Sequence, residues 1–242
     1  CAAPHGHVKH VENATCQSAA TLPKRHGHGD EHMFDTITEH LFEDGSEMAE
    51  ACGIMRRSGL LHSTRVATRF GWRPVQQLVA GEEVLTFDHG FQRITAIEHA
   101  INWPDHKTCP EHAAPLMVPA GVLGNSEKIW MLPAQLVVVE SDMAEILTGD
   151  PFALVPVDVL EGWKGITRVA PRAPHLVVVL HFEEDEVIYA GDGALLHSQG
   201  QGTMLDHLFG DVGYTPLERH QAKMVADDLR AQDALASATY EF

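Results

Sequence analysis

The chain has 242 residues, a length that fits one large or two small domains and is enough to bury a sizeable core. Asp and Glu number 34 against 17 Lys and Arg, so the formal net charge is −17 at pH 7. Binding to a nucleic-acid backbone needs a basic surface, and we therefore expect no nucleic-acid partner. The apolar runs fall short of the roughly eighteen residues that a membrane-spanning helix needs, so no membrane span is expected.

Residues 1–29 contain Gly, Pro and His with few large apolar side chains, which predicts an extended tail outside the fold. The histidines that crowd in and beside this tail are His5, His7, His10, His26, His28 and His32. Imidazole nitrogens bind zinc and other transition metals, and closely spaced pairs can share one ion. Two interpretations stay open: a metal site at these clusters, or a polar tail with weak metal affinity. No other cofactor is expected.

Four cysteines, Cys1, Cys16, Cys52 and Cys109, are scattered along the chain and form no C-x-x-C pair. This pattern favours free thiols in a reducing compartment, and we expect a cytoplasmic protein. The chain begins with Cys1, so the alternative of an exported lipoprotein with a lipidated first cysteine stays open.

Residues 30–57 are predicted to be helical, because apolar residues recur there at helical spacing. They form two sets, Phe34, Ile37, Leu41 and Phe42, then Met48, Ala51, Ile54 and Met55. The segment Asp44-Gly45-Ser46 separates the two sets, and Ser46 suits the N-cap of the second.

From about residue 63 the pattern changes to short apolar or alternating runs separated by Gly, Pro, Asn or Asp, which predicts a mainly β fold. The predicted strands lie within residues 65–70, 83–87, 129–132, 136–139, 176–180 and 187–190. Trp72, Trp130 and Trp163 are predicted to fill the core. The four consecutive acids of residues 183–186 are predicted to form a solvated turn.

Residues 215–242 are predicted to form a C-terminal helix with Thr215 as its N-cap and Pro216 at its first position. Its apolar stripe would comprise Leu217, Met224, Val225, Leu229 and Ala236. The predicted organisation is therefore a tail (1–29), a helical segment (30–57), a β domain (58–214) and a C-terminal helix (215–242).

The motif from Thr64 to Asp88 resembles the opening of a Hint domain, the module shared by hedgehog autoprocessing domains and inteins. Its element Leu78-Val-Ala-Gly81-Glu-Glu-Val84 matches the family's Leu-x-x-Gly-Asp-x-Val, with Glu82 in place of Asp. Further similar blocks are Trp72-Arg-Pro-Val75, Val118-Pro-Ala-Gly-Val-Leu-Gly-Asn125, Leu132-Pro-Ala-Gln135, Gly149-Asp-Pro-Phe-Ala-Leu-Val-Pro156 and Val187-Ile-Tyr-Ala-Gly-Asp192. The likeness is closest to bacterial Hint-type proteins and covers roughly residues 58–200. It implies a compact β fold of short strands.

The resemblance also implies an autoprocessing site, and this chain departs from it at three places. Gly59 stands where the family has the nucleophilic Cys or Ser, and glycine has no nucleophile for an acyl shift. Gln135 stands where the family has the His that protonates the leaving amide nitrogen, and an amide moves no proton near neutral pH. Ser198 stands where inteins have the terminal Asn. The chain is therefore predicted not to be a self-processing enzyme.

A shifted alignment leaves a rescue open. Ser58 or Cys52 would then supply the nucleophile, and His62 or His197 would supply the base. Three functions remain at this point: a non-processing Hint-type binding or structural subunit with a protein partner in a bacterial assembly, a self-cleaving domain, or a metal-binding protein acting through its His-rich tail. The acidic charge belongs mainly to the Hint-like part, since residues 58–242 hold 12 basic and 25 acidic side chains.

Overall fold

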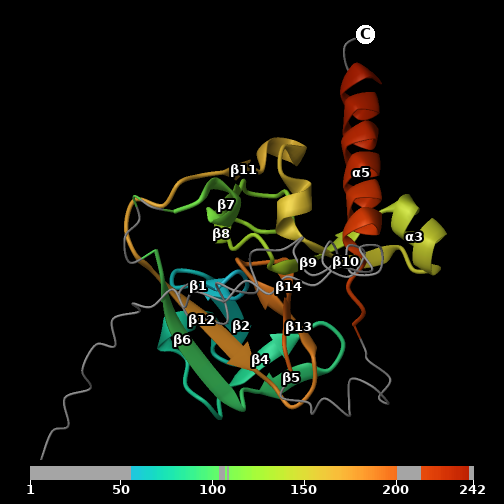
Figure 1. Cartoon of the computed structure of the whole chain (residues 1–242). Helices are drawn as coiled ribbons and strands as arrows, with labels where there is room; N and C mark the ends of the chain where they lie inside the picture. Colours follow the sequence, from blue (N-terminus) through green and yellow to red (C-terminus); the bar gives the residue numbers. More distant parts are fainter. Residues whose placement is uncertain (1–55, 104–106, 108, 201–213, 240–242) are drawn as a thin grey trace, which may run out of the picture. The chain divides into compact units, whose positions relative to one another are not determined.

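The computed structural model describes residues 56–103, 107, 109–200 and 214–239 (Figure 1). They belong to the second of the two units into which the chain divides, Gly45–Phe242. The predicted His-rich tail and nearly all of the predicted helical segment 30–57 lie outside the described residues.

Fourteen strands form two antiparallel sheets within the described part of the chain. The first sheet contains β1 (Leu60–Leu61), β6 (Ala96–Asn102), β7 (Leu116–Val118), β8 (Ile129–Met131), β11 (Thr167–Arg168) and β12 (His175–His181). Its strand order is β11-β7-β8-β1-β12-β6. The long β12–β6 pair runs in register from His175 opposite Asn102 to His181 opposite Ala96. This sheet carries Gly59 at the start of β1.

The second sheet contains β2 (Arg65–Thr68), β3 (Gly71–Pro74), β4 (Glu83–Thr86), β5 (Gly90–Arg93), β9 (Leu136–Glu140), β10 (Phe152–Pro156), β13 (Glu186–Ala190) and β14 (Ala194–Ser198). Its order is β10-β9-β14-β13-β2-β4-β5, with β3 paired to β2. Burial alternates along β9 and at the start of β14: Val137 and Leu196 face each other inward, so Val138 and Leu195 face outward. All six runs predicted as strands are strands, which confirms the mainly β fold.

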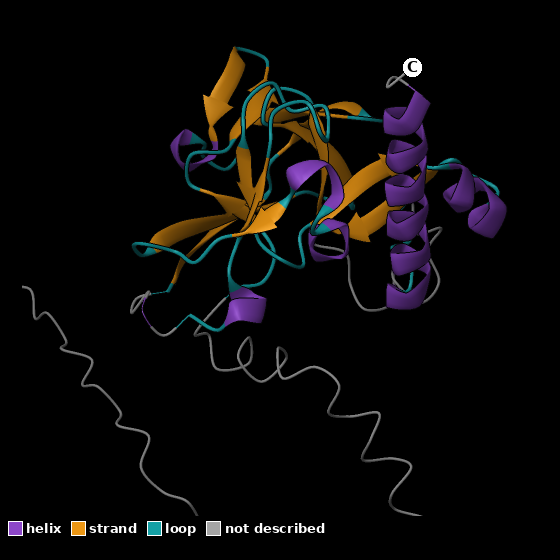
Figure 2. Ribbon diagram, turned by 90° about the horizontal axis from the view of Figure 1, so that it is seen from above, coloured by secondary structure: helices purple, strands orange, loops and turns teal. Residues whose placement is uncertain are grey.

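Helical elements connect and flank the sheets. Among the described residues, 3-10 turns are η1 (Val75–Gln77), η3 (Glu111–Ala113), η4 (Val157–Leu160) and η5 (Trp163–Gly165), and α-helices are α3 (Asp142–Thr148) and α5 (Arg219–Thr239). Figure 2 shows α5 standing beside the strands with α3 next to it, and α5 packs against α3, β10, η4 and η5. In the part of the chain that the model covers, no helix combines the length and apolar character needed to cross a membrane.

The C-terminal helix is present but begins at Arg219, four residues after the expected N-cap. The reason lies in the preceding backbone: Leu217 N donates to Leu154 O of β10, which ties this segment to the sheet. Glu218 takes the capping place instead, since its carbonyl accepts from Ala222 N and its N–H donates to Gln221 Oε1. The buried stripe is Ala222, Val225, Ala226 and Leu229, whereas Met224 and Ala236 of the predicted stripe are exposed.

Two further expectations about side chains were wrong in part. Of the three tryptophans predicted for the core, Trp163 is buried and Trp130 is partly buried against core residues, whereas Trp72 is 37% exposed on β3. The fourth, Trp103, is almost fully buried at the end of β6. The acidic run 183–186 is not wholly solvated either, because Glu186 begins β13 and is only 3% exposed.

Candidate functional site

The side chain of Gln135 joins three segments that are distant in the sequence. Its Oε1 accepts a hydrogen bond from Gly59 N at 3.0 Å, and its Nε2 donates to His197 O at 2.9 Å and to Leu136 O at 3.1 Å. The residue is 3% exposed, and its amide has a partner for its oxygen and for both protons. The structure therefore brings together the positions at which the sequence analysis expected the nucleophile and the proton donor. We call Gly59, Gln135 and the carbonyl of His197 the Gln135 corner.

Gly59 holds a backbone conformation that excludes the side chains of the expected nucleophile. Its φ is +116°, a region that residues with a Cβ rarely adopt. A Cβ here would lie 2.8 Å from Val177 Cγ1, 3.1 Å from Val179 Cγ2 and 3.3 Å from Val178 O, all on β12. A Ser or Cys at this position would be strained and would force the side chains of Val177 and Val179 to shift.

The alternative nucleophiles and bases from the sequence analysis do not gather at the Gln135 corner as side chains. Ser58 is exposed, and Cys52 lies outside the described residues. The His62 ring packs against His175, with ring centres 5.8 Å apart, and His175 in turn packs on buried Trp103. Burial, and secondarily the neighbouring His62, lower the pKa of His175. These contacts assign His62 to a separate cluster at β12.

His197 contributes its backbone to the Gln135 corner and its ring to another cluster. Its Nε2 lies 3.5 Å from Asp185 Oδ2 but forms no hydrogen bond, and its ring packs edge-on against Tyr214. Ser198, at the position of the intein Asn, donates from Oγ to Leu180 O at 2.7 Å and so fixes β14 to β12. Neither the His197 nor the Ser198 side chain forms a hydrogen bond with the Gly59 amide.

The second cluster is charged, and we call its members His89, Asp185, Glu186, Tyr214 and the ring of His197 the Glu186 corner. Both carboxylate oxygens of buried Glu186 lie 3.1 Å from His89 Nδ1. The hydrogen bond and the negative charge of Glu186 raise the pKa of His89, even though partial burial opposes this. Burial, reinforced by a hydrogen bond to Asp88, raises the pKa of the Tyr214 phenol far above its usual value.

Sequence reasoning missed the Glu186 corner, although one signal was present. Along residues 186–190, positions 186, 188 and 190 share one face of a strand, and Ile188 and Ala190 are typical core residues. The same alternation places Glu186 inward, and a buried carboxylate requires a partner. His89 in the turn between β4 and β5 is that partner.

No metal centre is found among the residues that the structure describes, where no three His, Cys, Asp or Glu side chains gather in a way that could hold an ion. The six N-terminal histidines of the predicted metal clusters lie outside these residues. Cys109 is a free, half-buried thiol, and burial raises its pKa, the opposite of what an activated nucleophile needs.

Comparison with known proteins places this site in a family context. The family model described as the Hint domain matches residues 58–202. Among solved structures, a bacterial intein-like domain from Clostridium thermocellum has a TM-score of 0.39 at 11% identity, covering 59% of this chain and 99% of that one. The AceL NrdHF class 3 split intein scores 0.37 at 13% identity (60% and 99% covered), and the gp41-1 intein 0.35 at 12% (58% and 98%). No curated protein sequence matches the chain.

Proposed function

Since the chain belongs to the Hint domain family, we propose that it is a non-processing member that serves as a binding or structural subunit in a bacterial assembly. The hydrogen bond between Gly59 and Gln135 carries this proposal. This hydrogen bond occupies the place where the family resemblance locates peptide cleavage. Neither of its two residues has a side chain that could act as a nucleophile or carry a proton.

The direction of this hydrogen bond matters for the chemistry. Expulsion of an amide nitrogen requires a group that donates a proton to it. Gln135 presents its oxygen to the Gly59 nitrogen, so the amide N–H is the donor and its peptide bond is held in its ground state. The direction of this hydrogen bond therefore supports a structural role for the Gln135 corner.

A binding role is supported by what the chain leaves on its surface. Aromatic side chains are exposed on the second sheet, among them Phe87 and Phe152, and their exposed fractions are 42% and 47%. Exposed aromatic groups are typical of protein interfaces. The strongly acidic composition favours a basic partner.

Intact-mass measurement of the full chain tests the non-processing proposal. We expect its mass to stay unchanged after incubation with thiol or hydroxylamine, because no acyl shift can start at Gly59. Cleavage of the peptide bond that precedes Ser58 or Cys52 would release a fragment and would overturn the proposal. Ser58→Ala and Cys52→Ala variants are the matched controls: a cleavage that disappears in one of them identifies the nucleophile of a self-cleaving domain.

A further inference from the structure

The outward face of the second sheet carries apolar side chains that no element of the described chain covers completely. Tyr189 of β13 lies opposite Leu195 of β14, and Val138 of β9 lies opposite Leu154 of β10. Phe87, just beyond β4, packs edge-on against Phe152, with ring centres 6.3 Å apart. The face includes two half-exposed phenylalanines. Covering such an apolar surface removes it from water and lowers the free energy.

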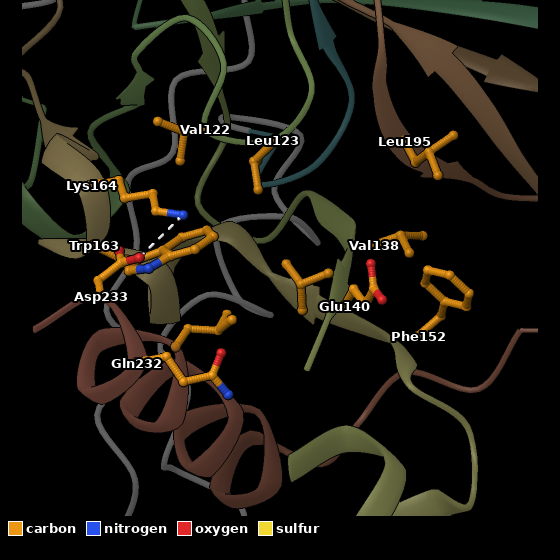
Figure 3. A pocket seen from close by; sticks show the side chains of 12 residues that line it. Val122, Leu123, Val138, Glu140, Phe152, Trp163, Lys164, Leu195, Gln232 and Asp233 are labelled. Atoms are coloured by element: carbon orange, nitrogen blue, oxygen red, sulfur yellow. Dashed lines mark ion pairs between the residues drawn. The ribbon is translucent and has the colours of Figure 1, made fainter. Parts of the chain in front are cut away.

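Two hollows adjoin on this face and together form what we call the outer groove. One has a volume of about 460 Å³ and extends from β9 to η5 and α5, and the other, of about 530 Å³, extends from β10 to the segment before α5. Val138 and Phe152 line both hollows, so the two hollows are direct neighbours. In Figure 3, Trp163, Lys164 and Asp233 lie on one side of the first hollow, opposite Val138 and Phe152.

The rim of the outer groove is acidic. Its charged side chains are the carboxylates of Asp88, Glu140, Asp150, Glu218 and Asp233 and the ammonium of Lys164. Lys164 is already held in place, since its Nζ pairs with Asp233 Oδ1 at 3.2 Å and lies 4.7 Å from the centre of the Trp163 ring. Glu140, in contrast, is exposed and has no ion pair within the described part of the chain. An apolar floor with a negative rim is complementary to a segment that combines apolar and basic residues.

We propose that the outer groove binds a cationic amphipathic segment of a partner protein, an inference that rests on the proposed role as a binding module. Apolar side chains of the segment cover Val138, Phe152 and Leu195, and its Lys or Arg side chains pair with the exposed carboxylates of Glu140 and Asp150. The chain's negative charge steers such a segment toward the groove, so binding weakens as the salt concentration rises.

Fluorescence anisotropy with the full chain and a labelled amphipathic Leu/Lys helical peptide as the probe tests this proposal. We expect Phe152→Ser to weaken binding by about tenfold or more, and Glu140→Lys by about fivefold, because both side chains lie in the groove. The matched controls replace the same residue types outside it. Phe70→Ser alters a more exposed phenylalanine, and Glu127→Lys reverses an exposed charge, and both are expected to stay within about twofold of the unsubstituted chain.

Three results would overturn the proposal: no binding of the peptide, equal losses in groove and control variants, or equal binding of a peptide in which Ser replaces every Lys. The second result would indicate attraction to the acidic chain as a whole. Circular dichroism shows whether each variant is folded. If Phe152→Ser does not fold, Glu140→Lys provides the test, because Glu140 is exposed. A failure here leaves the chain mass unchanged, whereas a failure of the non-processing proposal changes the mass, so the two are distinguishable.

Discussion

His197 joins two corners of the domain that differ in charge. Its carbonyl belongs to the Gln135 corner, which is neutral and closed by three hydrogen bonds of one amide side chain, one accepted and two donated. Its ring belongs to the Glu186 corner, where carboxylates, imidazoles and a phenol meet and the pKa values of His89 and Tyr214 are raised. The corner at which the resemblance implies catalysis thus holds no titratable side chain in its hydrogen bonds, and the titratable groups gather beside it.

The chemistry of Gln135 explains why the neutral corner can hold three segments together. An amide offers one acceptor and two donors in a fixed geometry, so it satisfies backbone groups from three segments at once without carrying a charge. A buried ionised group at the same place would require a compensating partner. Gln135 therefore ties β1, β9 and β14 together at little electrostatic cost.

The largest expected effect comes from removing this tie. Gln135→Ala leaves the Gly59 N–H and the His197 carbonyl without their partner and creates a small cavity, so we expect the free energy of unfolding to fall by about 3 kcal/mol. Urea unfolding followed by circular dichroism measures the change. Gln76→Ala, at an exposed position on η1, is the control and is expected to change it by less than about 0.5 kcal/mol. If the two variants lost equal stability, Gln135 would not be a structural tie.

A substitution of Gly59 separates two reasons for a glycine at the position where the family resemblance implies the nucleophile. Gly59→Ala meets both a positive φ and the side chains of β12, and we expect it to cost about 2–3 kcal/mol. Gly121 has a φ of +83° but nothing within 4 Å of a built Cβ, so Gly121→Ala reports the conformational cost alone, about 1 kcal/mol. Equal losses in the two variants would show that β12 yields and that the position is open to a side chain.

The sequence predicted most of the sheet framework, because alternation and turn residues are local signals. It missed α3, although Ser141 accepts from Met143 N as an N-cap and Gly149 closes the helix in a left-handed conformation. The sequence contains both capping residues, but the strand-like apolar runs on either side of them dominated the prediction. The start of α5 was not predictable locally, since the bond from Leu217 to β10 delays it.

The candidate site was predictable as a set of positions but not as a set of contacts. Counting back from Thr64 identified Gly59, and the Leu-Pro-Ala-Gln block identified Gln135. The hydrogen bond between them joins residues 76 positions apart, and the space around Gly59 is filled by β12, which comes more than a hundred residues later. Such facts depend on packing, which no local pattern encodes.

The smallest expected effect lies at the Glu186 corner and concerns its response to pH. Glu186 holds the pKa of His89 above the ordinary 6.5, and Asp88 and Glu184 act in the same direction. Because the folded-state pKa is raised, this pair stabilises the fold fully below about pH 6.5, and the contribution is lost as the pH rises through the raised pKa. In an NMR titration we expect the His89 pKa to exceed 6.5 and to fall in Glu186→Gln, whereas Glu127→Gln leaves it unchanged. An unchanged His89 pKa in Glu186→Gln would show that the charge contrast between the two corners has no effect on the protein's titration.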